Sequence, residues 1–222
     1  MKKKLLLIAL FSIALFVLSA CSGTDVVGKI SITSFDSVLK VSDVQKDEMN
    51  GGWSLSAPDR TARFIWSRDF DISDPHDVML ELDAKPFITA GLDTAKLPAG
   101  KFIDGKIMVG QSLGDASFPA NTQATALASY EQLVKIKREM VGYHEKLDHY
   151  GVDVGDGNKF EWAKDMSKND KDIVFVLDPK MFTDAGVDPA KVAGWAFAKV
   201  EVKDATGKPI EVEKFLKPFN LV

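Results

Sequence analysis

The sequence LDAKPFITAGLDTAKL, Leu82–Leu97, recurs without a gap as LDPKMFTDAGVDPAKV, Leu177–Val192, ninety-five positions later. Nine of the sixteen positions are identical, where average composition would give about one chance match. An internal repeat constrains the architecture more strongly than any single predicted element, because both copies are expected to fold in the same way. The sequence therefore predicts a tandem duplication.

Each copy of this block predicts a helical turn that stops and starts again. The first turn is expected at 85–90 and at 180–185, with Phe87 and Phe182 directed into the core. A glycine then stands where a left-handed residue ends a turn, and an aspartate follows as the N-cap of a second turn. These residues are Gly91, Asp93, Gly186 and Asp188. The block is therefore predicted to be structural.

The repeat extends in both directions from this block. Residues 34–41 match 129–136 at the same offset, and a three–four apolar spacing from Tyr130 to Leu147 predicts a helix in the second copy. The first copy is expected to hold a shorter helix that ends near Gly51. Strands are expected at 52–56, 64–70, 77–82 and 106–110, and at 151–155, 160–166, 172–177 and 199–203. A hairpin partner at 210–212 and an apolar tail at 215–222 complete the chain.

These elements predict an α+β fold with two copies of a helix–strand–strand–strand–turn–strand unit and a mostly antiparallel sheet, since the connections are short. Residues 34–110 form the first half, 111–128 a linker and 129–222 the second half. Because one helix and four short strands make a thin domain, we expect the halves to fuse around one core with a pseudo-twofold axis.

Residues 1–20 have the organisation of a secretory signal peptide. Lys2–Lys4 supply positive charge, Leu5–Leu18 is an apolar run too short to span a membrane, and Ser19 and Ala20 are small. Leu18-Ser19-Ala20-Cys21 resembles the lipobox of bacterial secreted lipoproteins. That resemblance implies cleavage before Cys21 and a diacylglycerol on its sulfur, with palmitate-like acyl chains. An ordinary signal peptide with an incidental cysteine is the alternative.

Cys21 is the only cysteine of the 222 residues, so lipidation would account for a thiol that has no disulfide partner. Residues 21–33 are then expected as a lipidated tether followed by a first strand, in which Ile30 and Ile32 alternate with polar neighbours. Ser22 fits the outer-membrane sorting of enterobacterial-type lipoproteins, and the choice between outer and cytoplasmic membrane stays open.

The charge of the processed chain bears on its partners. Loss of Lys2–Lys4 leaves 25 basic and 32 acidic residues, a net charge of −7. This balance argues against nucleic acid and against anionic headgroups as the main partner. The expected partners are the membrane, through the N-terminal lipid, and an unknown small molecule or envelope protein. No cofactor is implied.

Two short motifs suggest an enzyme. His144, Glu145 and His149 resemble the zincin helix motif, but that motif needs histidines four apart and these are five apart. A metal site there would need remote carboxylates or His76, and a solvated helix end is the simpler interpretation. Residues 110–114 match the nucleophile elbow with Ser112 in the middle, without the alternating α/β architecture that supports it.

Residues 153–158 do not fit a calcium loop, because glycines occupy two of its ligand positions, and a turn is the favoured interpretation. The pattern Phe-x-Trp-x-basic occurs in both halves and suggests a ligand platform of Trp66 with Arg68 and of Trp162 with Lys164. The same tryptophans fit a core equally well, since residues kept in both copies are those the scaffold needs. Function is expected where the copies differ, at Trp53, His76, 111–128 and 144–150.

The sequence therefore predicts a lipid-anchored extracytoplasmic module of the bacterial envelope that binds or interacts with an unknown ligand. An envelope enzyme, metal-dependent through His144, Glu145 and His149 or serine-based through Ser112, is the rival hypothesis. A purely structural envelope protein is the third.

Overall fold

The computed structural model describes residues 20–47, 51–68, 70, 77–113, 124–166, 171–204 and 206–221. The first half contains α1 (Ala20–Val41), β1 (Val44–Lys46), β2 (Trp53–Ser56), β3 (Ala62–Trp66), β4 (Val78–Asp83), α2 (Lys85–Thr89), the 3₁₀ helix η1 (Thr94–Lys96), β5 (Phe102–Ile103) and β6 (Lys106–Gln111). The second half contains α3 (Ala126–Ile136), η2 (Arg138–Met140), β7 (Val141–His144), β8 (His149–Gly155), β9 (Asn158–Ala163), β10 (Ile173–Leu177), α4 (Lys180–Asp184), η3 (Pro189–Lys191), β11 (Ala196–Lys203) and β12 (Pro209–Phe219).

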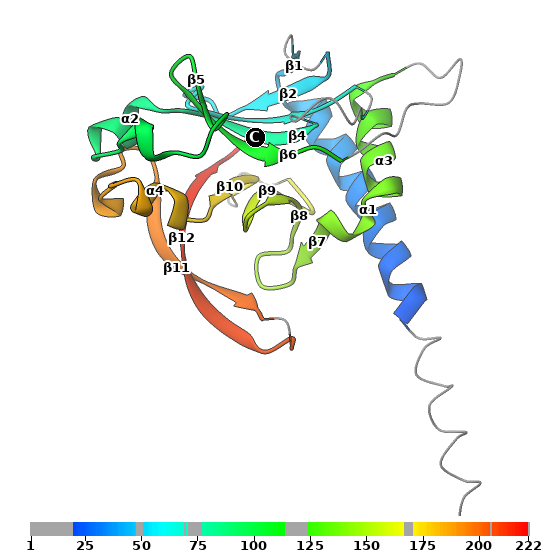
Figure 1. Ribbon diagram of the computed structural model, residues 1–222. Helices are drawn as coiled ribbons and strands as arrows, with labels where there is room; N and C mark the ends of the chain where they lie inside the picture. Colours follow the sequence, from blue (N-terminus) through cyan, green and yellow to red (C-terminus); the bar gives the residue numbers. More distant parts are fainter. Residues whose placement is uncertain are drawn as a thin grey trace, which may run out of the picture.

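Each half forms its own six-stranded antiparallel sheet in the described part of the chain. The strand order is β1-β2-β3-β4-β6-β5 in the first sheet and, from the equivalent edge, β7-β8-β9-β10-β12-β11 in the second. Figure 1 shows the two sheets as layers, with α1 beside α3 at one end and α2 beside α4 at the other. The predicted α+β duplication is confirmed.

The two sheets enclose one continuous hydrophobic cluster with members from both halves. Its centre consists of aromatic pairs that join equivalent positions of the two copies. These pairs are Phe64–Phe160 with centroids 4.4 Å apart, Phe87–Phe182 at 4.6 Å and Phe35–Tyr130 at 4.2 Å. Equivalent residues touch only near a twofold axis, so the pseudo-twofold axis passes through this core.

The helix of each half is bonded to the sheet of the other half. Ser34 in α1 donates from Oγ to the carbonyl of Ala163 in the second sheet at 3.0 Å. Its equivalent Ser129 in α3 donates from Oγ to the carbonyl of Ser67, just after β3 of the first sheet. The two halves are therefore interlocked rather than stacked as separate layers.

The repeated block adopts the predicted caps. Gly91 and Gly186 have φ of 108° and 100°, which glycine tolerates best. The Asp93 side chain accepts a hydrogen bond from the Ala95 N–H, and Asp188 does the same for Ala190. Expected strands at 52–56, 77–82, 151–155 and 172–177 also overlap β2, β4, β8 and β10.

The first strand expected within 21–33 is wrong, because α1 runs through these residues as one helix. Its packed face consists of residues at three–four spacing, namely Gly28, Ser31, Ser34, Phe35 and Val38. Small residues make up much of this face, so it has a weak apolar signal. Ile30, by contrast, is 39% exposed. The same helix ends at Val41 rather than near Gly51.

The long helix expected in the second copy is also wrong beyond Ile136. Lys137 leaves the helical region with φ −133° and ψ 52°, and β7 pairs with β8 in a hairpin from Val141 to Val152. The apolar residues at three–four spacing are therefore divided between α3, η2 and a hairpin. The pairing of β7 with β8 therefore favours a strand where the spacing alone predicts a helix.

The expected equivalence of the strands at 106–110 and 199–203 is also wrong. β6 pairs with β4, and its equivalent partner of β10 is β12, so the apolar tail at 215–222 is largely a central strand. β11 instead corresponds to β5, which pairs over two residues where β11 pairs over eight. The second half therefore carries an elongated hairpin.

Candidate functional site

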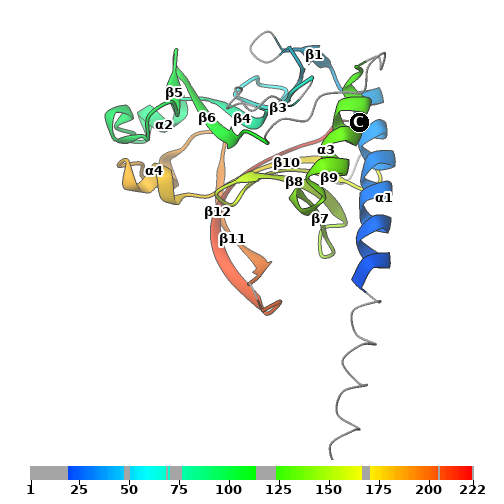
Figure 2. The same cartoon turned by 45° about the vertical axis from the view of Figure 1, so that its right-hand side comes forward.

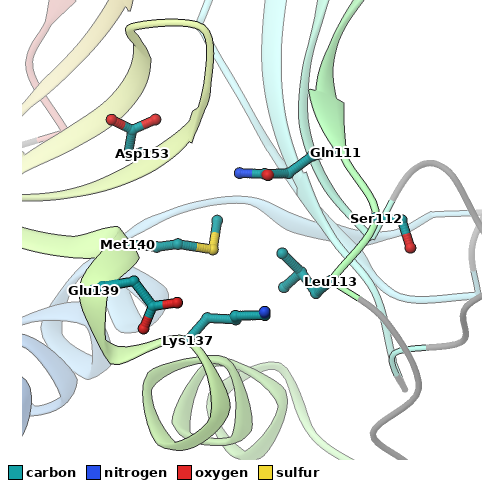
Figure 3. A pocket seen from close by; sticks show the side chains of 7 residues that line it. All are labelled: Gln111, Ser112, Leu113, Lys137, Glu139, Met140 and Asp153. Atoms are coloured by element: carbon teal, nitrogen blue, oxygen red, sulfur yellow. The ribbon is translucent and has the colours of Figure 1, made fainter.

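A pocket of about 290 Å³ lies where the end of β6 meets η2 and β8, between the two halves. Seven residues line it: Gln111, Ser112, Leu113, Lys137, Glu139, Met140 and Asp153 (Figure 3). Ligand pockets begin at roughly 300 Å³, so this volume suits a small molecule or the end of a larger one.

On the first-half side, Asp77 fixes the chain at the end of β6. Its Oδ2 accepts hydrogen bonds from the Leu113 N–H at 2.6 Å and from the Ser112 hydroxyl at 3.2 Å. The second half repeats this clamp, since Asp172 Oδ2 accepts from the Leu221 N–H at 2.6 Å. The clamp therefore belongs to the shared scaffold, and it positions Gln111 and Leu113 at the pocket.

On the second-half side, the end of α3 and a bulge in β8 shape the wall. Lys137 is the residue at which α3 stops, and Met140 ends η2. Asp153 Oδ1 accepts from the Gly155 N–H at 2.8 Å, beside a register shift in the β8–β9 pairing. A Cβ on Gly155 would lie 3.5 Å from Gln111 Nε2, so β8 approaches β6 closely here.

The pocket combines an apolar floor with mixed charge. Leu113 and Met140 are each 8% exposed. Figure 3 shows Gln111 and Asp153 on opposite walls, with the Gln111 amide pointing into the opening and Lys137 and Glu139 along the other side. The Ser112 hydroxyl points away from the opening. One cation, two carboxylates and an amide suit a small polar ligand that carries both donors and acceptors.

The predicted tryptophan platforms are not at this pocket. Trp66 and Trp162 are fully buried in the core, and Trp66 Nε1 donates to the Ala126 carbonyl at 3.0 Å. Arg68 and Lys164 lie beyond the ends of β3 and β9 and are exposed. Trp53 is partly buried and stacks on Trp66 with centroids 6.4 Å apart. His76 lies outside the described residues.

The residues of the predicted metal site lie on a hairpin instead of a helix. His144 on β7 and His149 on β8 are direct cross-strand partners, and Glu145 lies in the turn between them. His144 Nδ1 is 3.8 Å from Glu161 Oε2, while His149 is 4% exposed. Among the residues that the structure describes, no three His, Cys, Asp or Glu side chains form a group that could hold a metal ion.

The elbow match around Ser112 has a different structural basis. Gly110 is paired opposite Met79 in the sheet, where a Cβ would lie 2.2 Å from the Met79 Cβ. The Ser112 hydroxyl donates to Asp77, whereas a nucleophile elbow directs the hydroxyl toward a histidine base. Gly114 lies outside the described residues.

Part of the pocket falls in the region where function was expected, since Gln111, Ser112 and Leu113 begin the linker. Lys137, Glu139 and Met140 were missed because that segment was assigned to one continuous helix. For Asp153, the sequence suggests only an incomplete match to a calcium loop. The signal that could have identified them is the lack of matching residue types in the first copy.

Comparison with protein-family models, curated proteins and solved structures finds no match to this chain. Within the described ranges, none of the helices combines the length and the apolar character that a bilayer crossing requires.

Proposed function

We propose that this chain is a lipid-anchored extracytoplasmic module of the bacterial cell envelope that binds a small polar ligand. The observation that carries the anchoring is the succession of charged start, apolar run and Leu18-Ser19-Ala20-Cys21, with the chain's only cysteine at the acylation position. Two acyl chains on Cys21 would hold the protein on a membrane where one chain is marginal.

The pocket between the halves supports the binding role. In a duplicated fold, residues found in both copies serve the scaffold, and the pocket is lined by Gln111, Lys137, Glu139 and Asp153, which have no matching residue in the other copy. Binding sites occur preferentially where two structural units meet. Within the described residues, the serine-based enzyme has less support, because the Ser112 hydroxyl donates to Asp77 rather than to a histidine.

The anchoring is tested by producing the full chain in a bacterium that processes lipoproteins, fed with an alkyne-labelled palmitate. We expect the label on the wild type and a mature N-terminal peptide that begins with diacylglyceryl-Cys21. Cys21→Ala should lose the label and the mature N-terminus. An unlabelled wild type whose N-terminus is not Cys21 would refute the anchoring.

The binding role is tested with amino acids, sugars and short peptides as probes in thermal unfolding of a chain that begins at Ser22. A probe that raises the melting temperature should lose this effect in Gln111→Ala and Asp153→Ala. Glu211→Gln, at an exposed position of β12 that does not line the pocket, is the matched control and should retain it. An effect that survives in both pocket variants would rule out this site.

A further inference from the structure

At the outer end of the elongated hairpin of the second half, the face that continues from the core is charged and the opposite face is apolar. We define the distal ribbon as residues 199–203 of β11 and 209–213 of β12. Nearer the body, Phe197 and Phe215 are paired and face the core. Because side chains alternate, the face of Phe215 continues outward with the charged pair Lys199–Glu213.

The opposite face of the distal ribbon is apolar. Two cross-strand pairs form it, Val200 with Val212 and Val202 with Ile210. None of the four is buried, and Ile210 is 39% exposed. A solvated ribbon would be polar on the face away from the core, so this face is suited to contact with another apolar phase.

The place of the ribbon indicates what that phase is. Figures 1 and 2 show the distal ribbon on the side of the molecule toward which the N-terminal end of α1 projects. Residues 1–19 precede that end, and Cys21 lies in its first turn. The short hairpin formed by β5 lies on the opposite side (Figure 1). The element that breaks the twofold symmetry is therefore on the candidate anchor's side.

The lengths agree with contact at a membrane. Gly28 is buried against α3 and η2, where a Cβ would lie 3.0 Å from Arg138 Nε. Seven residues of helix separate it from Cys21, about 10 Å at the rise of an α-helix. Five residues of strand give the ribbon a reach of about 16 Å. A body held this close to its anchor brings the ribbon to the lipid surface.

We propose that the distal ribbon lies in the membrane surface on which Cys21 is anchored, with Val200, Val202, Ile210 and Val212 against the acyl boundary. The proposal rests on the lipid anchoring proposed above. The ribbon carries two lysines and three glutamates, so apolar contact rather than attraction to anionic headgroups drives it. The surface it fits is a zwitterionic bilayer as well as an anionic one.

The test uses the acylated chain, in which Cys21 is blocked and an introduced cysteine is the only free thiol. Ile210→Cys is compared with Ile103→Cys on β5, because these residues are 39% and 38% exposed. Glu211→Cys reports the charged face of the same ribbon. Each variant is labelled with an environment-sensitive fluorophore and incorporated into phosphatidylcholine vesicles that contain doxyl-labelled phosphatidylcholine.

We expect several-fold stronger quenching at position 210 than at 103 or 211, unchanged in high salt. Vesicle-bound protein with equal quenching at 210 and 103 would overturn the membrane contact and leave the anchoring intact. A second contrary result is a label at position 210 that reports an apolar environment only at high protein density and shows no quenching by the doxyl lipid. That result would assign the ribbon to contact between copies of the chain and would also overturn the membrane contact. Failure of the chain to be acylated would refute the anchoring itself.

Discussion

Gly91 and Gly186 lie against each other across the pseudo-twofold axis. A Cβ on Gly91 would lie 2.8 Å from the Gly186 carbonyl oxygen, and one on Gly186 would lie 3.0 Å from that of Gly91. Reciprocal backbone bonds flank them, since the Asp93 N–H donates to the Ala185 carbonyl and Asp188 to that of Ala90, both at 2.8 Å. The repeated block is thus one of the places where the two copies bond to each other.

Replacement of either glycine by alanine should destabilise the whole fold. Gly91→Ala and Gly186→Ala should each cost about 2–4 kcal/mol, because a strained φ combines with a clash against backbone. Gly100→Ala, with φ of 78° and nothing within 4 Å, is the control and should cost about 1–2 kcal/mol. Urea unfolding midpoints measure the difference. Equal losses at positions 91 and 100 would contradict the close approach.

Removal of the serine hydroxyls that join helix and opposite sheet should weaken the interlock. Ser34→Ala and Ser129→Ala leave buried carbonyl groups without these donors, and each should lower the free energy of unfolding by about 1–2 kcal/mol. Ser37→Ala on the exposed face of α1 should change it by less than about 0.5 kcal/mol. Similar effects at positions 34 and 37 would show that the cross-half bonds contribute little.

The Lys217–Asp59 ion pair joins the two halves at the core's edge and should make stability depend on pH. Lys217 is 7% exposed, donates to Asp59 Oδ2 at 2.5 Å and lies 5.8 Å above the Trp195 ring. Burial alone would raise the pKa of Asp59, but hydrogen bonds from Lys217 and Thr61 and the charge of Lys217 together lower it. The stabilisation is therefore present above the ordinary carboxyl pKa and lost as pH falls through the lowered one.

Asp59→Asn keeps the turn and removes the charge. We expect a loss of about 1–2 kcal/mol at pH 7, moderated by the exposure of Asp59, and a loss that shrinks toward pH 3. Asp184→Asn removes an exposed ion pair with Lys180 on one helical turn and serves as the control. Unfolding curves of both variants between pH 3 and 7 are the measurement. A difference in the free energy of unfolding between the wild type and Asp59→Asn that stays constant over this pH range would refute the pH dependence.

The three tyrosines should ionise late in the folded protein. Burial raises the pKa of Tyr130 and of Tyr150, while the hydrogen bond to Asp148, together with burial, raises that of Tyr143 to about 12. A raised tyrosine pKa stabilises the fold below pH 10, and this contribution is lost as pH rises, because the unfolded chain releases its protons first.

Absorbance at 295 nm should therefore show little tyrosinate at pH 10 in the folded protein and about half ionisation in guanidinium. Asp148→Asn should lower the pKa of Tyr143 and, to a smaller extent, that of Tyr150, because the charge of Asp148 raises both. A titration curve that is the same for folded and unfolded chains would contradict these environments.

The best-predicted parts of the fold depend on local chemistry. Gly91, Asp93 and their copies indicated the stop and restart of a helix, because glycine and aspartate act through their own backbone. The strands β2, β4, β8 and β10 followed from alternation or from apolar runs. The duplication itself is visible from the identical residues of the two copies.

The failures occurred where partners distant in sequence decided the structure. Val141–His149 has apolar residues at a spacing that fits a helix, yet it forms a hairpin because β8 lies beside it. Ile30 and Ile32 suggested a strand, while Gly28, Ser31 and Ser34 form the face of α1 that packs on the second sheet. In the pocket, Lys137 and Asp153 come together only because β6 ends between η2 and β8.

The sequence alone determined the repeat, its caps and the candidate acylation position, because each depends on residue types at short spacing. Only the tertiary structure decided that the helix of each copy bonds to the sheet of the other, that β12 rather than β11 pairs with β10, and that a pocket opens between the halves. Those features depend on which surfaces bury each other, and the free energy of that burial belongs to the pairing of distant segments rather than to any one of them.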